Sequence, residues 1–244
     1  MNRFLQNLGK HLAGFLNEPM ARYESFDRVD EKLLAATLKP GDVLLVEGNT
    51  RIGRAIRYIT QSNWSHAALY VGDELSMDNP NMLIEADIVE GVIAVPLSTY
   101  AHLNLRICRP VGISDGDRQT LIEYVVAQRG HAYDLKNVFD LLRFYMPIPM
   151  PSRFRRRMLA FGSGEPTQAI CSTLIAKAFQ LVRYPILPRH VEDCTEEDCL
   201  KQRHFSYFTP SDFDRSPYFA IIKPTLEKGF DYSHLNWVEE PDED

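Results

Sequence analysis

The sequence predicts an α+β protein in which an antiparallel sheet packs against helices. Residues 42–110 contain several short runs that are rich in apolar and β-branched residues, with turn residues between them. Short connections favour antiparallel pairing of such strands. The second half of the chain shows helical periodicity instead, and strands followed by helices are typical of the α+β class.

The composition is that of a globular protein and excludes two broad classes. The 244 residues are 45% hydrophobic and 25% charged, and the length suits one large domain with a full core or two small domains. The formal net charge is −6, and the acidic end 239–244 supplies most of it. A general nucleic-acid binder is therefore excluded, because its surface is basic. The four cysteines are too few for a disulfide scaffold.

The predicted sheet begins after the turn Lys39-Pro40-Gly41. A strand over 42–47 leads into a helix over 51–61 with one apolar side. The other strands are expected at 66–72, 82–88, 92–97, 105–110 and, late in the chain, 218–222. We expect the late strand to return to an edge of the sheet.

Helical segments dominate the second half. The first is capped by Asp115 or Asp117 and ends near Gly130. A second helix spans 134–145, and a basic segment spans 153–161. The last helix spans about 168–182 and is expected to turn Leu174, Ala178 and Leu181 inward.

Apolar residues also recur at helical spacing near the N-terminus, at Phe4, Leu5, Leu8, Leu12, Phe15 and Leu16. Such an amphipathic helix either packs on the protein's own body or contacts a membrane surface. This segment lacks the apolar core and cleavage site of a signal peptide, and no run approaches the roughly 20 apolar residues of a membrane span. The sequence therefore predicts a cytoplasmic protein.

Cys171 lies at the start of the predicted helix 168–182. Free N–H groups and the positive end of the helix dipole stabilise a thiolate at that position. The same N–H groups can bind an oxyanion. Taken alone, the position fits a small buried core cysteine equally well.

A thiolate nucleophile needs a base, and the base needs an orienting partner. His66 begins a predicted strand, where its polar ring is not needed for packing, although a structural histidine also fits there. Glu85 and Asp87 interrupt the next apolar strand. If opposed position numbers in the two strands sum to 153, both carboxylates share a face with His66. Spacing alone allows either carboxylate as the partner.

Six motifs occur in the order of a known family: Leu38-Lys39-Pro40-Gly41-Asp42, Ser65-His66-Ala67-Ala68-Leu69-Tyr70-Val71-Gly72, Ile84-Glu85-Ala86, Tyr133-Asp134, Cys171-Ser172 and Thr209-Pro210-Ser211-Asp212-Phe213. Over residues 38–222 the chain resembles the permuted papain-like amidases of the YiiX/YaeF type, in the NlpC-related cysteine peptidase superfamily.

The resemblance implies a circularly permuted papain-like fold of the NlpC type, in which the histidine precedes the cysteine along the chain. It implies that Cys171 is the nucleophile and that His66 is the general base and acid. It also selects Glu85, rather than Asp87, as the orienting carboxylate. Tyr133 is implied to line the oxyanion site, to which we also assign Ser172. The corresponding domains are an N-terminal helical segment 1–37, a catalytic domain 38–225 and an acidic tail 226–244.

Two arginine groups flank the motifs, one at Arg51, Arg54 and Arg57 and the other at Arg143, Arg153, Arg155, Arg156 and Arg157. Such groups are usually solvated faces, but guanidinium groups also bind phosphate and carboxylate. We therefore treat Arg54 and Arg57 as candidate substrate-binding residues.

A zinc site is not expected. His190, Cys194, Cys199 and His204 lie close together in the sequence, but their spacing matches none of the common zinc patterns. The mechanism implied by the resemblance requires no metal and no cofactor.

The sequence thus predicts a cysteine-dependent, amidase- or peptidase-like hydrolase that cleaves an amide or ester through an acyl-thioester. One open alternative is a lipid acyltransferase or phospholipase of the lecithin:retinol acyltransferase-like type. Another is a non-catalytic binding module on the same fold. The expected substrate is a small molecule, a peptide or a lipid, nucleic acid is not expected as a partner, and residues 4–16 are a candidate peripheral membrane contact.

Overall fold

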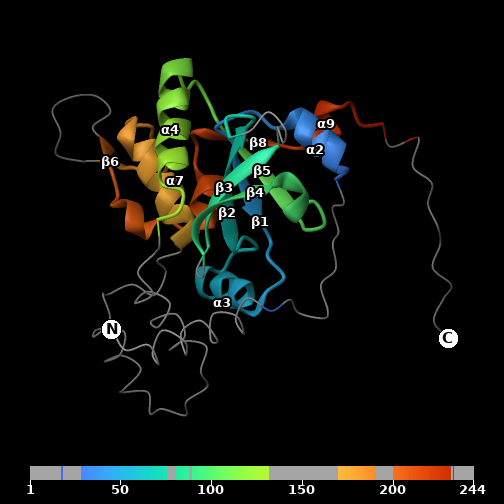
Figure 1. Cartoon of the computed structure of the whole chain (residues 1–244), viewed down its shortest axis with the longest axis horizontal. Helices are drawn as coiled ribbons and strands as arrows, with labels where there is room; N and C mark the ends of the chain where they lie inside the picture. The colour runs from blue at the N-terminus through green and yellow to red at the C-terminus, as the bar shows by residue number, and fades with distance from the viewer. Residues whose placement is uncertain are drawn as a thin grey trace, which may run out of the picture.

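The computed structural model describes residues 18, 29–75, 81–87, 90–131, 170–190, 200–231 and 233. At its centre lies a six-stranded sheet with the strand order β4-β3-β2-β1-β5-β8 (Figure 1). Every neighbouring pair is antiparallel. The strands are β1 (Val43–Val46), β2 (His66–Gly72), β3 (Met82–Asp87), β4 (Gly91–Pro96), β5 (Leu105–Pro110) and β8 (Phe219–Ile222).

Helices and two short turns of 3-10 helix surround this sheet. In chain order they are α2 (Glu31–Thr37), α3 (Arg51–Thr60), η1 (Leu97–Thr99), α4 (Asp115–Ala127), α7 (Ile170–Leu181), η2 (Phe205–Tyr207), α8 (Pro210–Arg215) and α9 (Pro224–Glu227). A separate two-stranded ribbon joins β6 (Arg189–His190) to β7 (Leu200–Lys201). The mixture of helices and an antiparallel sheet confirms the predicted α+β class.

The strands agree closely with the sequence prediction. The strands expected at 66–72 and 105–110 have those bounds, and the others differ by at most one residue at either end. The late strand β8 pairs with β5 at one edge of the sheet, as predicted. The helix predicted over 134–145 and the basic segment 153–161 lie outside the described residues.

The register between β2 and β3 is the one that the sequence suggested. Leu69 pairs with Ile84 and Tyr70 with Leu83, so that opposed position numbers sum to 153. A register shift follows only near the turn, where Gly72 pairs with Met82. Because alternate residues of a strand share a face, His66 of β2 and Glu85 of β3 lie on one side of the sheet.

Two predictions about the helices were wrong. The cap of α4 is Ser114, whose hydroxyl accepts the Asp117 N–H at 3.1 Å, and both aspartates lie inside the first turn. Negative side chains are favourable there because of the helix dipole. In α7, Leu174 and Ala178 are buried as expected, but Leu181 is 55% exposed because the helix ends at that residue.

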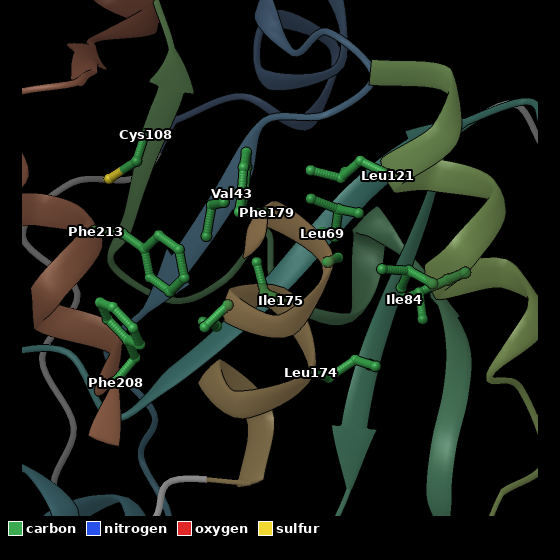
Figure 2. Close-up of a cluster of buried hydrophobic side chains, with 14 of the residues drawn as sticks. Val43, Leu69, Ile84, Cys108, Leu121, Leu174, Ile175, Phe179, Phe208 and Phe213 are labelled. Carbon is green, nitrogen blue, oxygen red and sulfur yellow. The ribbon is translucent and has the colours of Figure 1, made fainter. Parts of the chain in front are cut away.

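The two faces of the sheet carry separate apolar clusters. On the first face, α4, α7 and α8 cover strand residues such as Val43 and Leu69, and Figure 2 shows Ile175 and Phe179 of α7 among them. Phe179 packs tilted against Phe213 of α8 at 6.2 Å between ring centroids.

The second face is covered mainly by α2, which lies on the opposite side of the sheet from α4 and α7 (Figure 1). Its Leu34 packs in one cluster with Leu44, Leu83 and Leu97, and Tyr100 packs against the edge of that cluster. The long apolar residues are thus divided between two layers, and the sheet is held from both sides.

A buried ion pair locks the turn that precedes β1. The Asp42 side chain is 1% exposed and receives Nη2 and Nε of Arg109 at 2.7 and 2.9 Å. The same carboxylate accepts the Lys39 N–H at 2.8 Å, and Arg109 also donates to the Thr37 carbonyl at 2.7 Å. One aspartate thereby ties the turn, the end of α2 and β5 together.

Candidate active site

His66 stands at the first position of β2, at the end of the sheet near which α3 lies (Figure 1). The two residues before it are anchored. Trp64 donates its indole N–H to Asp214 at 3.0 Å, and the buried Ser65 hydroxyl accepts the Gly48 N–H at 2.9 Å. A side chain at Gly48 would stand 2.8 Å from that hydroxyl, so glycine is required for this approach. The backbone that leads into His66 is therefore held in place by the two residues before it.

Glu85 is the carboxylate that engages His66. His66 Nε2 lies 3.1 Å from Glu85 Oε2, and the Glu85 residue is only 4% exposed. An ionised carboxylate has no proton to donate, so the Nε2–H group donates. Asp87 accepts the Glu90 N–H at 2.9 Å.

Cys171 is the second residue of α7 and is 5% exposed. Its thiol lies close enough to His66 to raise the pKa of the imidazole, through its charge and through hydrogen bonding. Because Glu85 occupies Nε2, the ring nitrogen left for the thiol is Nδ1. The structure thus brings Cys171, His66 and Glu85 into one chain of contacts, with the imidazole between the sulfur and the carboxylate.

The electrostatics of the three groups are coupled. Burial opposes a charge on His66, but the charges of Glu85 and Cys171 and its hydrogen bonds to both outweigh burial and raise the pKa of His66 well above 6.5. Burial also opposes ionisation of Glu85, yet the charge of His66 and the hydrogen bonds that Glu85 accepts keep its pKa below the ordinary value. The ionised Glu85 therefore stabilises the positive charge that His66 acquires when it takes up a proton.

Tyr100 is a residue of the site that the sequence did not reveal. Its hydroxyl donates to Glu85 Oε2 at 2.6 Å, and its ring centroid lies 5.7 Å from that of His66. Tyr100 follows η1, and the turn of η1 brings it back toward β3. No sequence signal marks it, because a tyrosine after a strand is an ordinary core residue and the direction of a short turn is not encoded by periodicity.

The remaining candidate residues have different surroundings. The Ser172 hydroxyl is fully buried and donates to the Phe208 carbonyl at 2.6 Å, so a contribution to an oxyanion site would come from its backbone N–H. The Arg57 guanidinium is paired with Glu47. Arg54 is exposed on α3. Tyr133 lies outside the described residues.

Several further predictions also fall on residues that the structure does not describe. They concern the amphipathic segment 4–16, the second arginine group 143–157, Cys194, Cys199 and the acidic end 239–244. Within the described ranges, no helix has the length and apolar character to cross a membrane. In the same ranges, no cluster of three or more His, Cys, Asp or Glu side chains is placed to hold a metal ion.

Comparisons with known proteins place this geometry in context. No curated protein matches the sequence. A solved structure described as metalloprotein yiiX from Escherichia coli O157:H7 is similar, with a TM-score of 0.49 and 16% identity over 77% of this chain and 97% of that chain. Residues 37–145 match the family of permuted papain-like amidase enzymes, YaeF/YiiX, C92.

The matched segment contains His66, Glu85 and Tyr100, whereas Cys171 lies beyond it. The family is one of amidases, which supports a hydrolase. The resemblance drawn from the motifs is therefore confirmed over residues 37–145, which match the permuted papain-like amidase family.

Proposed function

We propose that this protein is a cysteine-dependent hydrolase of the amidase type, with Cys171 as nucleophile, His66 as general base and acid, and Glu85 as the orienting carboxylate. The observation that carries the proposal is the contact chain from the Cys171 thiol through His66 to the buried Glu85. A nucleophile beside a base that is itself oriented by a third group is the arrangement that covalent catalysis requires.

The reaction begins with transfer of the thiol proton to His66 Nδ1. The thiolate attacks the carbonyl carbon of an amide or ester, and the C=O electron pair moves to oxygen. N–H groups of the first turn of α7 stabilise this oxyanion, because the positive end of the helix dipole lies there. When the tetrahedral intermediate collapses, the imidazolium gives its proton to the leaving amine or alcohol, and an acyl-thioester remains on Cys171.

The second half of the reaction reverses these roles. His66 takes a proton from water, the hydroxide oxygen attacks the thioester carbonyl, and the thiol leaves with the proton that His66 returns. Glu85 remains ionised and holds the imidazole ring in place. If an alcohol or amine acceptor replaces water, the same intermediate gives acyl transfer, so hydrolase and acyltransferase differ only in this step.

Alkylation of cysteine tests the nucleophile without knowledge of the substrate. Native protein is treated with iodoacetamide, and mass spectrometry follows each cysteine over time. Cys108 is the internal control, because it is fully buried and burial raises the pKa of its thiol. We expect Cys171 to react first, and His66→Ala to slow its reaction on the order of a hundredfold. The assignment fails if Cys171 reacts no faster than Cys108, Cys194 or Cys199.

A further inference from the structure

We propose that Tyr100 is a positioning residue of this site, whose hydroxyl fixes the Glu85 carboxylate in the orientation that engages His66. The inference rests on the proposed function and extends the chain of contacts by one member. Neither the motifs of the sequence nor the family match assigns a role to this tyrosine.

Tyr100 and His66 share one acceptor atom of Glu85. Glu85 Oε2 accepts both the Tyr100 hydroxyl, at 2.6 Å, and His66 Nε2, at 3.1 Å. A distance of 2.6 Å is characteristic of a hydroxyl that donates to a charged oxygen, which is a strong hydrogen bond. Two donors that converge on one oxygen leave the carboxylate little freedom to rotate away from the imidazole.

Burial of the Glu85 charge costs free energy that its hydrogen-bond donors offset. A carboxylate that is 4% exposed takes up a proton unless partners stabilise its charge. The hydrogen bond from Tyr100 is one of the interactions that hold the pKa of Glu85 down. Burial and the charge of Glu85 raise the pKa of Tyr100 itself, so the phenol keeps its proton and acts as a donor rather than a base.

Tyr100 is itself held in place by its neighbours. Its N–H donates to the Leu97 carbonyl at 3.1 Å, and the Leu97 N–H donates to the Asn81 carbonyl at 2.9 Å. Leu97 is fully buried in the cluster beneath α2. A group that positions a catalytic residue must be locked by its own surroundings, and Tyr100 meets that requirement.

The experiment compares Tyr100→Phe with Tyr70→Phe. Tyr70 belongs to the same buried cluster, but its hydroxyl donates to Asn81 at 3.0 Å and not to Glu85. Both substitutions remove one buried hydroxyl and keep the ring. The readout is the pH titration of the Glu85 carboxyl carbon by ¹³C NMR, with the signal assigned through Glu85→Gln.

We expect Tyr100→Phe to raise the pKa of Glu85, because a donor to its charged form is lost, and Tyr70→Phe to leave it unchanged. A role confined to packing would leave the titration of Glu85 unmoved in both variants. The alkylation rate of Cys171 at mildly acidic pH should fall about tenfold in Tyr100→Phe, the loss expected for one hydrogen bond to a charged group.

A second perturbation covers the case in which Tyr100→Phe does not fold. Replacing Tyr100 by a ring-fluorinated tyrosine makes the phenol a stronger donor, so the pKa of Glu85 should fall instead of rise. An unmoved Glu85 titration in the variant that folds overturns the role of Tyr100. Failure of the proposed function is a separate result, because it appears in the wild-type protein as a Cys171 that alkylates no faster than Cys108.

Discussion

His66 and Glu85 affect stability as well as chemistry, because both titrate differently in the folded chain. Because the pKa of His66 is raised by folding, His66 adds to the free energy of unfolding. This addition is complete when the pH is below the ordinary value of 6.5, and it is lost as the pH rises through the pKa of the folded state. Because the pKa of Glu85 is lowered by folding, Glu85 also adds to the free energy of unfolding. This addition is complete when the pH is above the ordinary value of 4.5, and it is lost as the pH falls through the pKa of the folded state. Both contributions are complete between pH 4.5 and 6.5.

The substitution Glu85→Gln is therefore expected to lower the free energy of unfolding most between pH 4.5 and 6.5. The loss should be about 2 kcal/mol, because the half-buried imidazolium of His66 is left without its counter-charge. Urea unfolding of both proteins across the pH range measures the difference, which should shrink at higher and at lower pH. Glu123→Gln on the exposed side of α4 is the control and should show no such window. A difference that stays constant with pH would contradict the coupling.

Some residues of the site could be predicted from the sequence, and others could not. His66 and Cys171 could be proposed because a polar ring opening an apolar strand and a thiol at a helix start both carry a physical rationale. Spacing could not choose between Glu85 and Asp87, since residues two apart share a strand face. The direction of the Ser172 hydroxyl and the return of Tyr100 were not predictable, because both depend on how turns pack in three dimensions.

At the scale of elements, the Asp42–Arg109 pair joins three segments through one buried carboxylate. Asp42→Asn should destabilise the protein by about 3 kcal/mol, because Arg109 keeps its charge and loses its partner. Thermal or urea unfolding measures the loss. The matched control is Asp115→Asn, which removes the same charge from a pair with Arg118 in which the aspartate side chain is 94% exposed. Its effect should be much smaller; equal losses would show that burial of the pair does not matter.

The strands were easier to predict than the short helices. β2 and β5 could be bounded to the residue because turn residues flank them and their apolar runs are short. The four residues of α9 and the six of α8 are too few to show a helical period. Ser114 and the two aspartates after it are all good capping residues, so the sequence allowed more than one start for α4.

At the scale of the whole molecule, the site depends on both layers that cover the sheet. Cys171 is carried by α7 on the first face, whereas Tyr100 packs against the cluster beneath α2 on the second. Leu34 of α2 is 1% exposed and packs in that cluster with Leu97. A change in α2 should therefore reach the catalytic residues although none of them belongs to it.

Leu34→Ala is expected to destabilise the protein by about 3 kcal/mol, through lost burial and the cavity that remains. We also expect slower alkylation of Cys171, because the support of Tyr100 is weakened. Leu226→Ala is the control, since Leu226 is 58% exposed on α9. Unfolding curves and alkylation rates are compared for the three proteins. Loss of stability with an unchanged alkylation rate would show that α2 does not support the site.

The position of Cys171 far beyond β2 and β3 has a consequence for biosynthesis. Strands β1 to β5 are near neighbours in the chain and can pair early as it leaves the ribosome, since contacts between nearby segments form fastest. α7 and β8 are synthesised later and complete the structure by docking on that sheet. We therefore expect Cys171 to reach His66 only at the end of folding. Incomplete chains would carry His66 and Glu85 without a reactive thiol.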